Sequence, residues 1–161
     1  MNEGAEIDHI NAMKLTVLKY ACIHKSDEMI SLLIEKGADL FVVNKKSGYT
    51  LLHTAAQRGL FWLIKLLVEK GLDVNAREKN GNGPLSTAGN KHKISTYLME
   101  HGADPKMENN YGNSPFNNSA VAYDYIRDPS KKDNGIRTDD IFEALEKKDQ
   151  TSIVLMTVKK H

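Results

Sequence analysis

The chain has 161 residues, and its 22 Lys and Arg against 21 Asp and Glu leave a net charge of +1. Nucleic-acid binding depends on clustered cations, so this balance argues against a nucleic-acid partner. The single cysteine excludes an intrachain disulfide and fits a reducing compartment, and the first residues, MNEGAEIDHINAMK, lack the pattern of a signal peptide. No apolar run approaches the roughly 20 residues that span a membrane. We therefore expect a cytoplasmic protein without a membrane segment.

The first predicted element is a helix pair at roughly 16–24 and 27–36, preceded by a loose or capping lead-in over residues 1 to about 10. Its apolar spacing predicts a set of inward side chains: Leu18, Ala21, Cys22, Ile30, Leu33 and Ile34. Cys22 falls among small apolar positions and has no apparent partner base nearby. We therefore interpret it as a buried side chain rather than a nucleophile.

The second unit is the best formed. A glycine-bearing turn leads to Thr50, which is placed to cap a short helix that Gly59 breaks. A second helix then ends at Gly71, where a left-handed residue is expected. The predicted core positions are Leu52, Ala55, Ala56, Ile64, Leu67 and Val68.

The third unit matches over 83–104 but has two residues fewer between its helices. Its predicted core positions are Leu85, Ala88, Leu98 and Met99. Gly89 replaces an alanine, which costs roughly 1 kcal/mol inside a helix, and Ser95 stands where the earlier units carry Ile30 and Ile64. We expect this unit to open first.

A fourth unit begins at Tyr111 and then gives way to turn-forming residues. We interpret 127–138 as a connector and 139–161 as a C-terminal helical cap resembling a partial fifth repeat, with an unrelated helical hairpin as the alternative.

The unit starts are 34, 33 and 31 residues apart at Thr16, Thr50, Gly83 and Ser114, and they carry TVLKYAC, TLLHTAAQRG, GPLSTAG and SPFNNSA. This pattern resembles the ankyrin-repeat family, whose unit is a β-turn and two helices with a T-P-L-H-x-A signature and a 33-residue period. Only the second unit keeps the histidine. The resemblance implies an all-α ankyrin-repeat solenoid over 1–126, with four repeats at about 11–44, 45–77, 78–108 and 109–126, followed by the cap.

Candidate catalytic, cofactor-binding and metal-binding residues are absent from this interpretation. The resemblance implies that His53 ties neighbouring turns together, and the other histidines show no metal-ligand spacing. Gly81 and Gly83 lack the Lys-Ser/Thr of a phosphate loop. We therefore expect no enzyme activity and no cofactor.

The resemblance implies that partners bind on a concave face made by turn tips and first helices. The matching residues are Tyr20, His24, Lys46, Tyr49, Gln57, Arg58, Lys79, Asn82 and Tyr111. Tyr49 and Arg58 are expected to be central and to point into one groove, where neither is needed for stacking. Trp62 should be partly exposed on the other face, either packed on an adjacent helix or marking a second interface.

The expected function is a non-enzymatic protein-protein interaction module, monomeric when free, whose partner carries an acidic rim. The alternative is a stoichiometric inhibitor of an enzyme, such as an immunity or antitoxin protein, that uses the same face. Fold alone does not decide between them.

Overall fold

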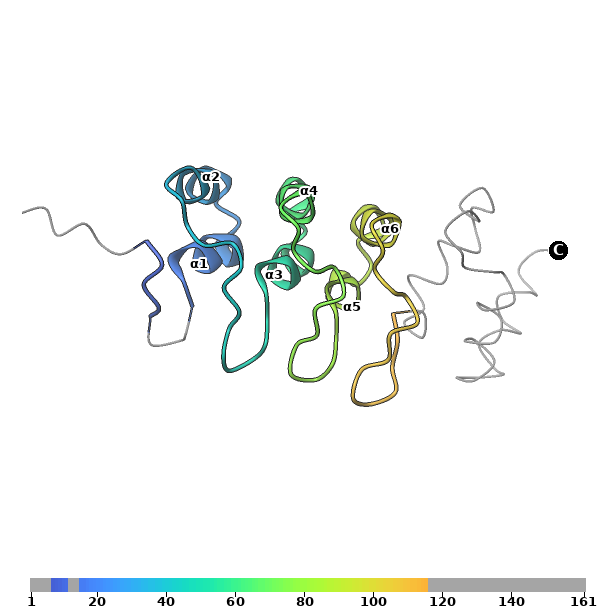
Figure 1. The fold of residues 1–161 in the computed structure, drawn as a ribbon. Helices are drawn as coiled ribbons and strands as arrows, with labels where there is room; N and C mark the ends of the chain where they lie inside the picture. The colour runs from blue at the N-terminus through green and yellow to red at the C-terminus, as the bar shows by residue number, and fades with distance from the viewer. Residues whose placement is uncertain (1–6, 12–14, 116–161) are drawn as a thin grey trace, which may run out of the picture.

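The computed structural model describes residues 7–11 and 15–115, which form three helix pairs in a row (Figure 1). The helices are α1 Val17–His24, α2 Asp27–Glu35, α3 Leu51–Arg58, α4 Phe61–Glu69, α5 Pro84–Ala88 and α6 His92–Glu100. Helices α1, α3 and α5 form an inner layer, and α2, α4 and α6 form an outer layer, with long loops projecting beside the inner layer. No strand occurs within the described ranges, where the only pairing of that kind is one isolated bridge, Ile10 to Thr16. The expected all-α solenoid is confirmed.

The helix ends follow the expected capping chemistry. The Thr16 and Thr50 hydroxyls accept from the backbone N–H groups of Lys19 and His53, which satisfies a donor at each helix start. Helix α3 ends at Gly59, whose φ of 80° is left-handed, and α1 ends at Lys25, which adopts φ 56° in the equivalent place. The first two helix pairs therefore differ little in backbone path.

One apolar core runs through all three helix pairs. The side chains of Leu52, Leu63, Ile64 and Leu67 in the second pair are fully buried, and Leu18, Leu85 and Leu98 extend the core to either side. Leu33, Ile34 and Val68 are only partly buried at its edge. Each pair alone buries little, so stability comes from stacking between neighbours.

The loops record a one-residue insertion. In the second and third loops, a backbone N–H donates to the carbonyl four residues later, at Glu78 to Asn82 and Asn109 to Asn113. In the first loop the same bond joins Asn44 to Tyr49, five residues apart. The extra residue thus lies in the turn and leaves the helix register intact.

The third pair differs from the expectation for Gly89. This residue does not lie inside a helix: α5 has five residues and ends at Ala88, and Gly89 follows at φ 58°. The expected helix-interior cost therefore does not apply, because a left-handed φ is one that glycine adopts readily. The defect lies instead in Ser95, which is buried with no hydrogen-bond partner for its hydroxyl among the described residues.

The lead-in is not loose over its last residues. The Asp8 carboxylate accepts from the Asp39 backbone N–H at 2.9 Å, which fixes residues 7–11 against the loop that follows α2. Apart from residues 109–115, the expected fourth repeat, the connector 127–138 and the cap 139–161 lie outside the described residues.

Replacing Ser95 by alanine is expected to stabilise the protein. The change removes a buried, unsatisfied hydroxyl, whose burial costs about 1–3 kcal/mol. Equilibrium denaturation should show a rise of about 1 kcal/mol in unfolding free energy. Ser31→Ala, at an exposed position of α2, is the matched control for helix propensity. An equal gain from both variants would contradict the assignment.

Candidate functional site

Three turn tips, residues 44–49, 78–82 and 109–113, form the most regular surface of the described structure. In each, the side chain of the first residue organises the turn: Asn44 Oδ1 accepts from the backbone of Lys46 and Ser47, and Asn109 Oδ1 accepts from Tyr111 and Asn113. Glu78 does the same with a carboxylate oxygen, which accepts from the Asn82 backbone N–H at 3.2 Å and from the Asn82 side-chain amide at 2.7 Å. These bonds preform the tips.

Neighbouring turn tips are joined to one another. The Lys79 N–H donates to the Ser47 carbonyl at 2.9 Å, and the Asn110 N–H donates to the Asn80 carbonyl at 2.8 Å. Gly81 favours glycine because its φ of 82° is left-handed, and an added Cβ would also lie 3.0 Å from the backbone N of Asn110. The tips are therefore one continuous, rigid edge.

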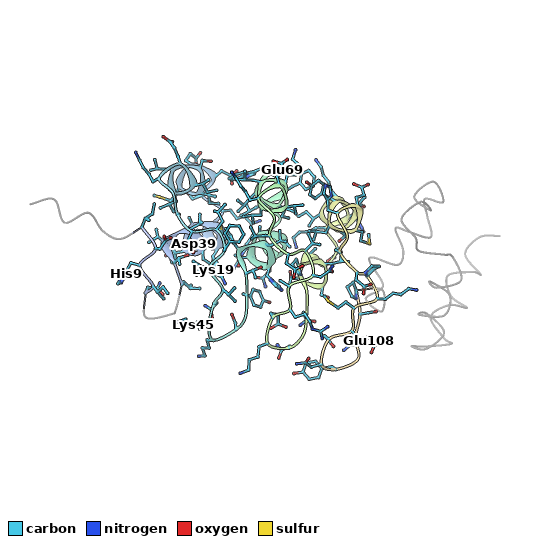
Figure 2. All side chains as sticks on the ribbon, viewed as in Figure 1. His9, Lys19, Asp39, Lys45, Glu69 and Glu108 are labelled. Carbon is cyan, nitrogen blue, oxygen red and sulfur yellow. The ribbon has the colours of Figure 1, made fainter. Side chains whose placement is uncertain are left out.

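A second set of bonds ties each inner helix to the following turn. His53 Nε2 donates to the Asn82 carbonyl at 3.1 Å, while its Nδ1 accepts from the Thr50 backbone N–H at 3.3 Å. Lys19 occupies the same position one repeat earlier, and its Nζ donates to the Tyr49 carbonyl at 3.1 Å. Figure 2 shows Lys19 among the inner helices, away from the loop ends near Lys45 and Glu108. The third helix pair has Ser86 at this position, which is too short to reach the next turn.

The comparisons with known proteins agree with this architecture. A family model described as "Ankyrin repeats (3 copies)" matches residues 1–78. The chain is 38% identical over 98 residues to a putative ankyrin repeat-containing protein of Treponema pallidum, covering 60% of this chain and 33% of that protein. Residues 1–78 are therefore ankyrin repeats, and the later described helix pair shares their architecture. The helix pair α5–α6 lies beyond the matched residues, as its shortened first helix would suggest.

Two further relatives are similar to this chain over a small part of their own length. The mouse B-cell lymphoma 3 protein homolog is 31% identical over 114 residues, 70% of this chain and 25% of that protein. Rat protein phosphatase 1 regulatory subunit 12A is 33% identical over 99 residues, 58% of this chain and 9% of that protein. The chain thus spans a third or less of the relatives named here. Ankyrin repeats generally mediate protein-protein interaction.

Four of the expected partner-binding residues meet in one pocket between the first two turn tips. The pocket has a volume of about 450 Å3, and it is lined by Asn44, Lys46, Ser47, Tyr49, Glu78, Lys79, Asn80 and Asn82. Lys46 and Lys79 are exposed and hold equivalent places in successive tips, whereas Glu78 is buried. The pocket therefore combines an aromatic wall with a cationic rim.

The structure separates the other expected residues from this pocket. Arg58 ends α3 and Tyr49 precedes it, so a helix axis of roughly 13 Å lies between them. The structure does not bring Arg58 and Tyr49 together in this pocket, because Arg58 is not among the residues that line it. Gln57 and His24 also lie at the ends of α3 and α1, Tyr20 lines a different pocket near His9, and Tyr111 is 73% exposed on the third tip.

The expectation that Tyr49 is not needed for the stacking of the repeats is wrong. Its ring lies 5.2 Å from the His53 ring and 5.5 Å from Lys19 Nζ, and its carbonyl accepts from that amine. The ring therefore packs against the junction of the first two repeats. Only its hydroxyl can be removed without disturbing these contacts.

Trp62 follows the first of the two alternatives. Its indole Nε1 donates to Asp27 Oδ1 at 3.1 Å, which joins α4 to the start of α2. The tryptophan is half-buried in this contact. It therefore packs on the adjacent outer helix.

Burial sets the protonation of the groups around the pocket. Burial lowers the pKa of Lys19 to about 8 and raises the pKa of the Cys22 thiol to about 12. Burial opposes ionisation of Glu78, but hydrogen bonds from Asn80 and Asn82 hold its pKa below the ordinary value. Burial and then Glu78 raise the pKa of Tyr49, so its phenol stays protonated and can donate a hydrogen bond.

Sequence reasoning missed Lys19 and Glu78. The signal for Lys19 was present, because the repeat register places it 34 residues before His53, in the position that ties turns together. Glu78 had no such signal, since its partner Asn82 lies in the same turn. Across the described ranges, no cluster of three or more His, Cys, Asp or Glu could hold a metal ion. No helix there is long and apolar enough to cross a membrane.

Replacing Ser86 by histidine is expected to stabilise the third repeat. Ser86 lines a polar cavity of about 350 Å3 together with Asn113, whose carbonyl is equivalent to that of Asn82. The new imidazole has room to donate to this carbonyl, which should raise the unfolding free energy by about 1 kcal/mol. Ser86→Leu fills similar space without a donor. Equal denaturation midpoints for the two variants would contradict the predicted hydrogen bond to the Asn113 carbonyl.

His53 should make the stability depend on pH. Burial lowers its pKa below 6.5, so the unfolded chain binds a proton at a higher pH than the folded one does. Unfolding free energy should therefore fall as pH drops below about 6.5. Denaturant titrations at pH 7.5, 6.5 and 5.5 should show a shallower loss in His53→Gln than in the parent, whereas His24→Gln, at an exposed position, should retain the parental slope.

Proposed function

We propose that this chain is a non-enzymatic binding module that holds an acidic segment of a protein partner in the pocket around Tyr49. The observation that carries the proposal is the pocket itself, with a partly buried aromatic wall between two exposed lysines on rigidly joined turn tips. Tyrosine is enriched among residues that dominate binding energy. Because the tips are preformed, little ordering cost opposes association.

The charges around the pocket favour an anionic partner. Glu78 is the acidic residue in the lining, but its carboxylate already accepts two hydrogen bonds from Asn82 and is buried. The charges offered to a partner are therefore those of Lys46 and Lys79. A carboxylate lying between these amines could also accept from the protonated Tyr49 phenol, and charge-assisted bonds of this kind are the stronger ones.

Charge reversal at the rim tests this site. A partner is first captured with the parent chain from native lysate and identified by mass spectrometry, and its purified form is then titrated by calorimetry. Lys46→Glu/Lys79→Glu should weaken affinity at least about tenfold and remove most of its salt dependence. Lys36→Glu/Lys70→Glu makes the same change in net charge on the exposed ends of α2 and α4 and should bind like the parent.

Tyr49→Phe sharpens the test, because the ring that packs on Lys19 and His53 stays in place while the hydroxyl is lost. Melting should remain unchanged and affinity should fall by about 1.5 kcal/mol or more, as for a hydrogen bond to a charged group. Affinity that survives these changes but is lost in Trp62→Ala would assign the interface to the outer layer instead.

A second candidate is the stoichiometric inhibitor, and one comparison favours it. The rat relative is by name a regulatory subunit of a phosphatase, so a segment similar to this chain occurs there in a protein that regulates an enzyme. If the captured partner is an enzyme, its activity is measured while the chain is added. Loss of activity at a 1:1 ratio supports inhibition, and full activity in the saturated complex supports simple binding.

A further inference from the structure

Residues 7–11 and 15–16 repeat hydrogen bonds of the later turn tips. The Asn11 N–H donates to the Leu15 carbonyl at 3.0 Å and the Leu15 N–H donates to Asn11 Oδ1 at 3.1 Å. Asn109 and Asn113 make the same two bonds at 2.8 and 3.0 Å. Asn11 and Leu15 are therefore paired in the same way as the first and last residues of a later turn tip.

The residues that precede Asn11 also match the later loops in sequence position. Asp8 stands eight residues before the N-cap Thr16, as Asn75 stands eight residues before the N-cap Gly83. Asp8 Oδ1 accepts from the Asp39 N–H, and Asn75 Oδ1 accepts from the equivalent Asp104 N–H at 2.8 Å. The residues before α1 are thus joined to the first repeat by the same kind of hydrogen bond that joins the loop after α4 to the third repeat.

In the second repeat, the face of α3 that points toward the N-terminal end of the row is covered by α1. Among the described residues, no helix pair covers the equivalent face of α1 in the first repeat. Val17 and Tyr20 are 45% and 47% exposed, whereas Leu51 and Thr54, at the same positions of α3, are 4% and 2% exposed because α1 packs there. Ile10 is 44% exposed beside them. A largely apolar pocket of about 240 Å3 marks this end face, lined by His9, Asn11, Leu15, Thr16, Val17 and Tyr20.

The hydrogen-bonding groups of the end face also have counterparts. The carbonyls of Tyr49 and Asn82 each accept the N–H of their own turn and a side-chain donor from the preceding inner helix, Lys19 or His53. The equivalent carbonyl before α1 is that of Leu15, which accepts from Asn11. A carbonyl oxygen has two lone pairs, so Leu15 can take a second donor in the same way.

We propose that this end face docks a helical hairpin of the ankyrin type belonging to a partner chain. The inner helix of that hairpin would cover Val17 and Tyr20 and bring a lysine or histidine to the Leu15 carbonyl. The chain's own stacking of α1 on α3 shows how such a helix sits. Tyr20 favours a separate partner, because a bulky aromatic anchor replaces the small, enclosed Thr54 at this position, and tyrosine is enriched in interfaces between chains.

The probe replaces residues 1–6 by a copy of residues 45–73, which is joined directly to Ile7 and so to the rest of the chain. Ile7 is equivalent to Val74, so this fusion keeps the copied His53 as far from Leu15 as His53 is from Asn82. Tethering gives the hairpin a high effective concentration without knowledge of the natural partner. The fusion should melt about 5 °C or more above the parent, and hydrogen exchange should show protection of the copied helices and of the first turn of α1.

Two matched variants separate docking from general effects of the fusion. Val17→Asp/Tyr20→Asp should abolish the gain in the fusion but change the melting of the unfused chain little, because both side chains are exposed there. Alanine at the copied histidine should remove part of the gain. Unprotected copied helices with unchanged melting would overturn the proposal. So would an unfused chain that dimerises in light scattering and becomes monomeric in Tyr20→Asp, because a second copy would then occupy the face.

Discussion

The structure depends on one recurring hydrogen bond, from a side chain of an inner helix to the backbone carbonyl that closes the next turn. Lys19 and His53 make this bond at the same 3.1 Å distance although their chemistry differs. The amine must be desolvated to do so, and its pKa falls to about 8, whereas the imidazole is held neutral by burial. The geometry of the repeat thus requires a donor at this point and tolerates different donors, which explains why the motif histidine occurs only once.

The third repeat shows the effect of a missing donor. Ser86 leaves a polar cavity at the next junction, α5 is reduced to five residues, and Ser95 buries a hydroxyl where two isoleucines fill the core. These features lie on one repeat, and each repeat is coupled only to its neighbours. The weakness therefore stays local. The junction of the first two repeats keeps its tie and its packed Tyr49, and one wall of the pocket rests on it.

The repeat period predicted most of this fold, because helix caps and left-handed glycines depend on local chemistry that is visible in the sequence. The positions that side chains take in the fold were less predictable from the sequence. Arg58 and Tyr49 are close in sequence but lie at opposite ends of α3, and Tyr49 packs inward because Lys19 lies beneath it. The pairing of Asn11 with Leu15 was missed, because Asp8 and Asn11 match the later excursions in hydrogen bonding but not in motif.

Lys19 connects the two surfaces that these arguments identify. It lies on α1 between Val17 and Tyr20 of the end face, and it also holds the carbonyl and ring of Tyr49, which lines the pocket. The same helix therefore supports both surfaces. Because the turn tips are already preformed and Lys19 already holds Tyr49, the pocket is ordered without an occupant on the end face.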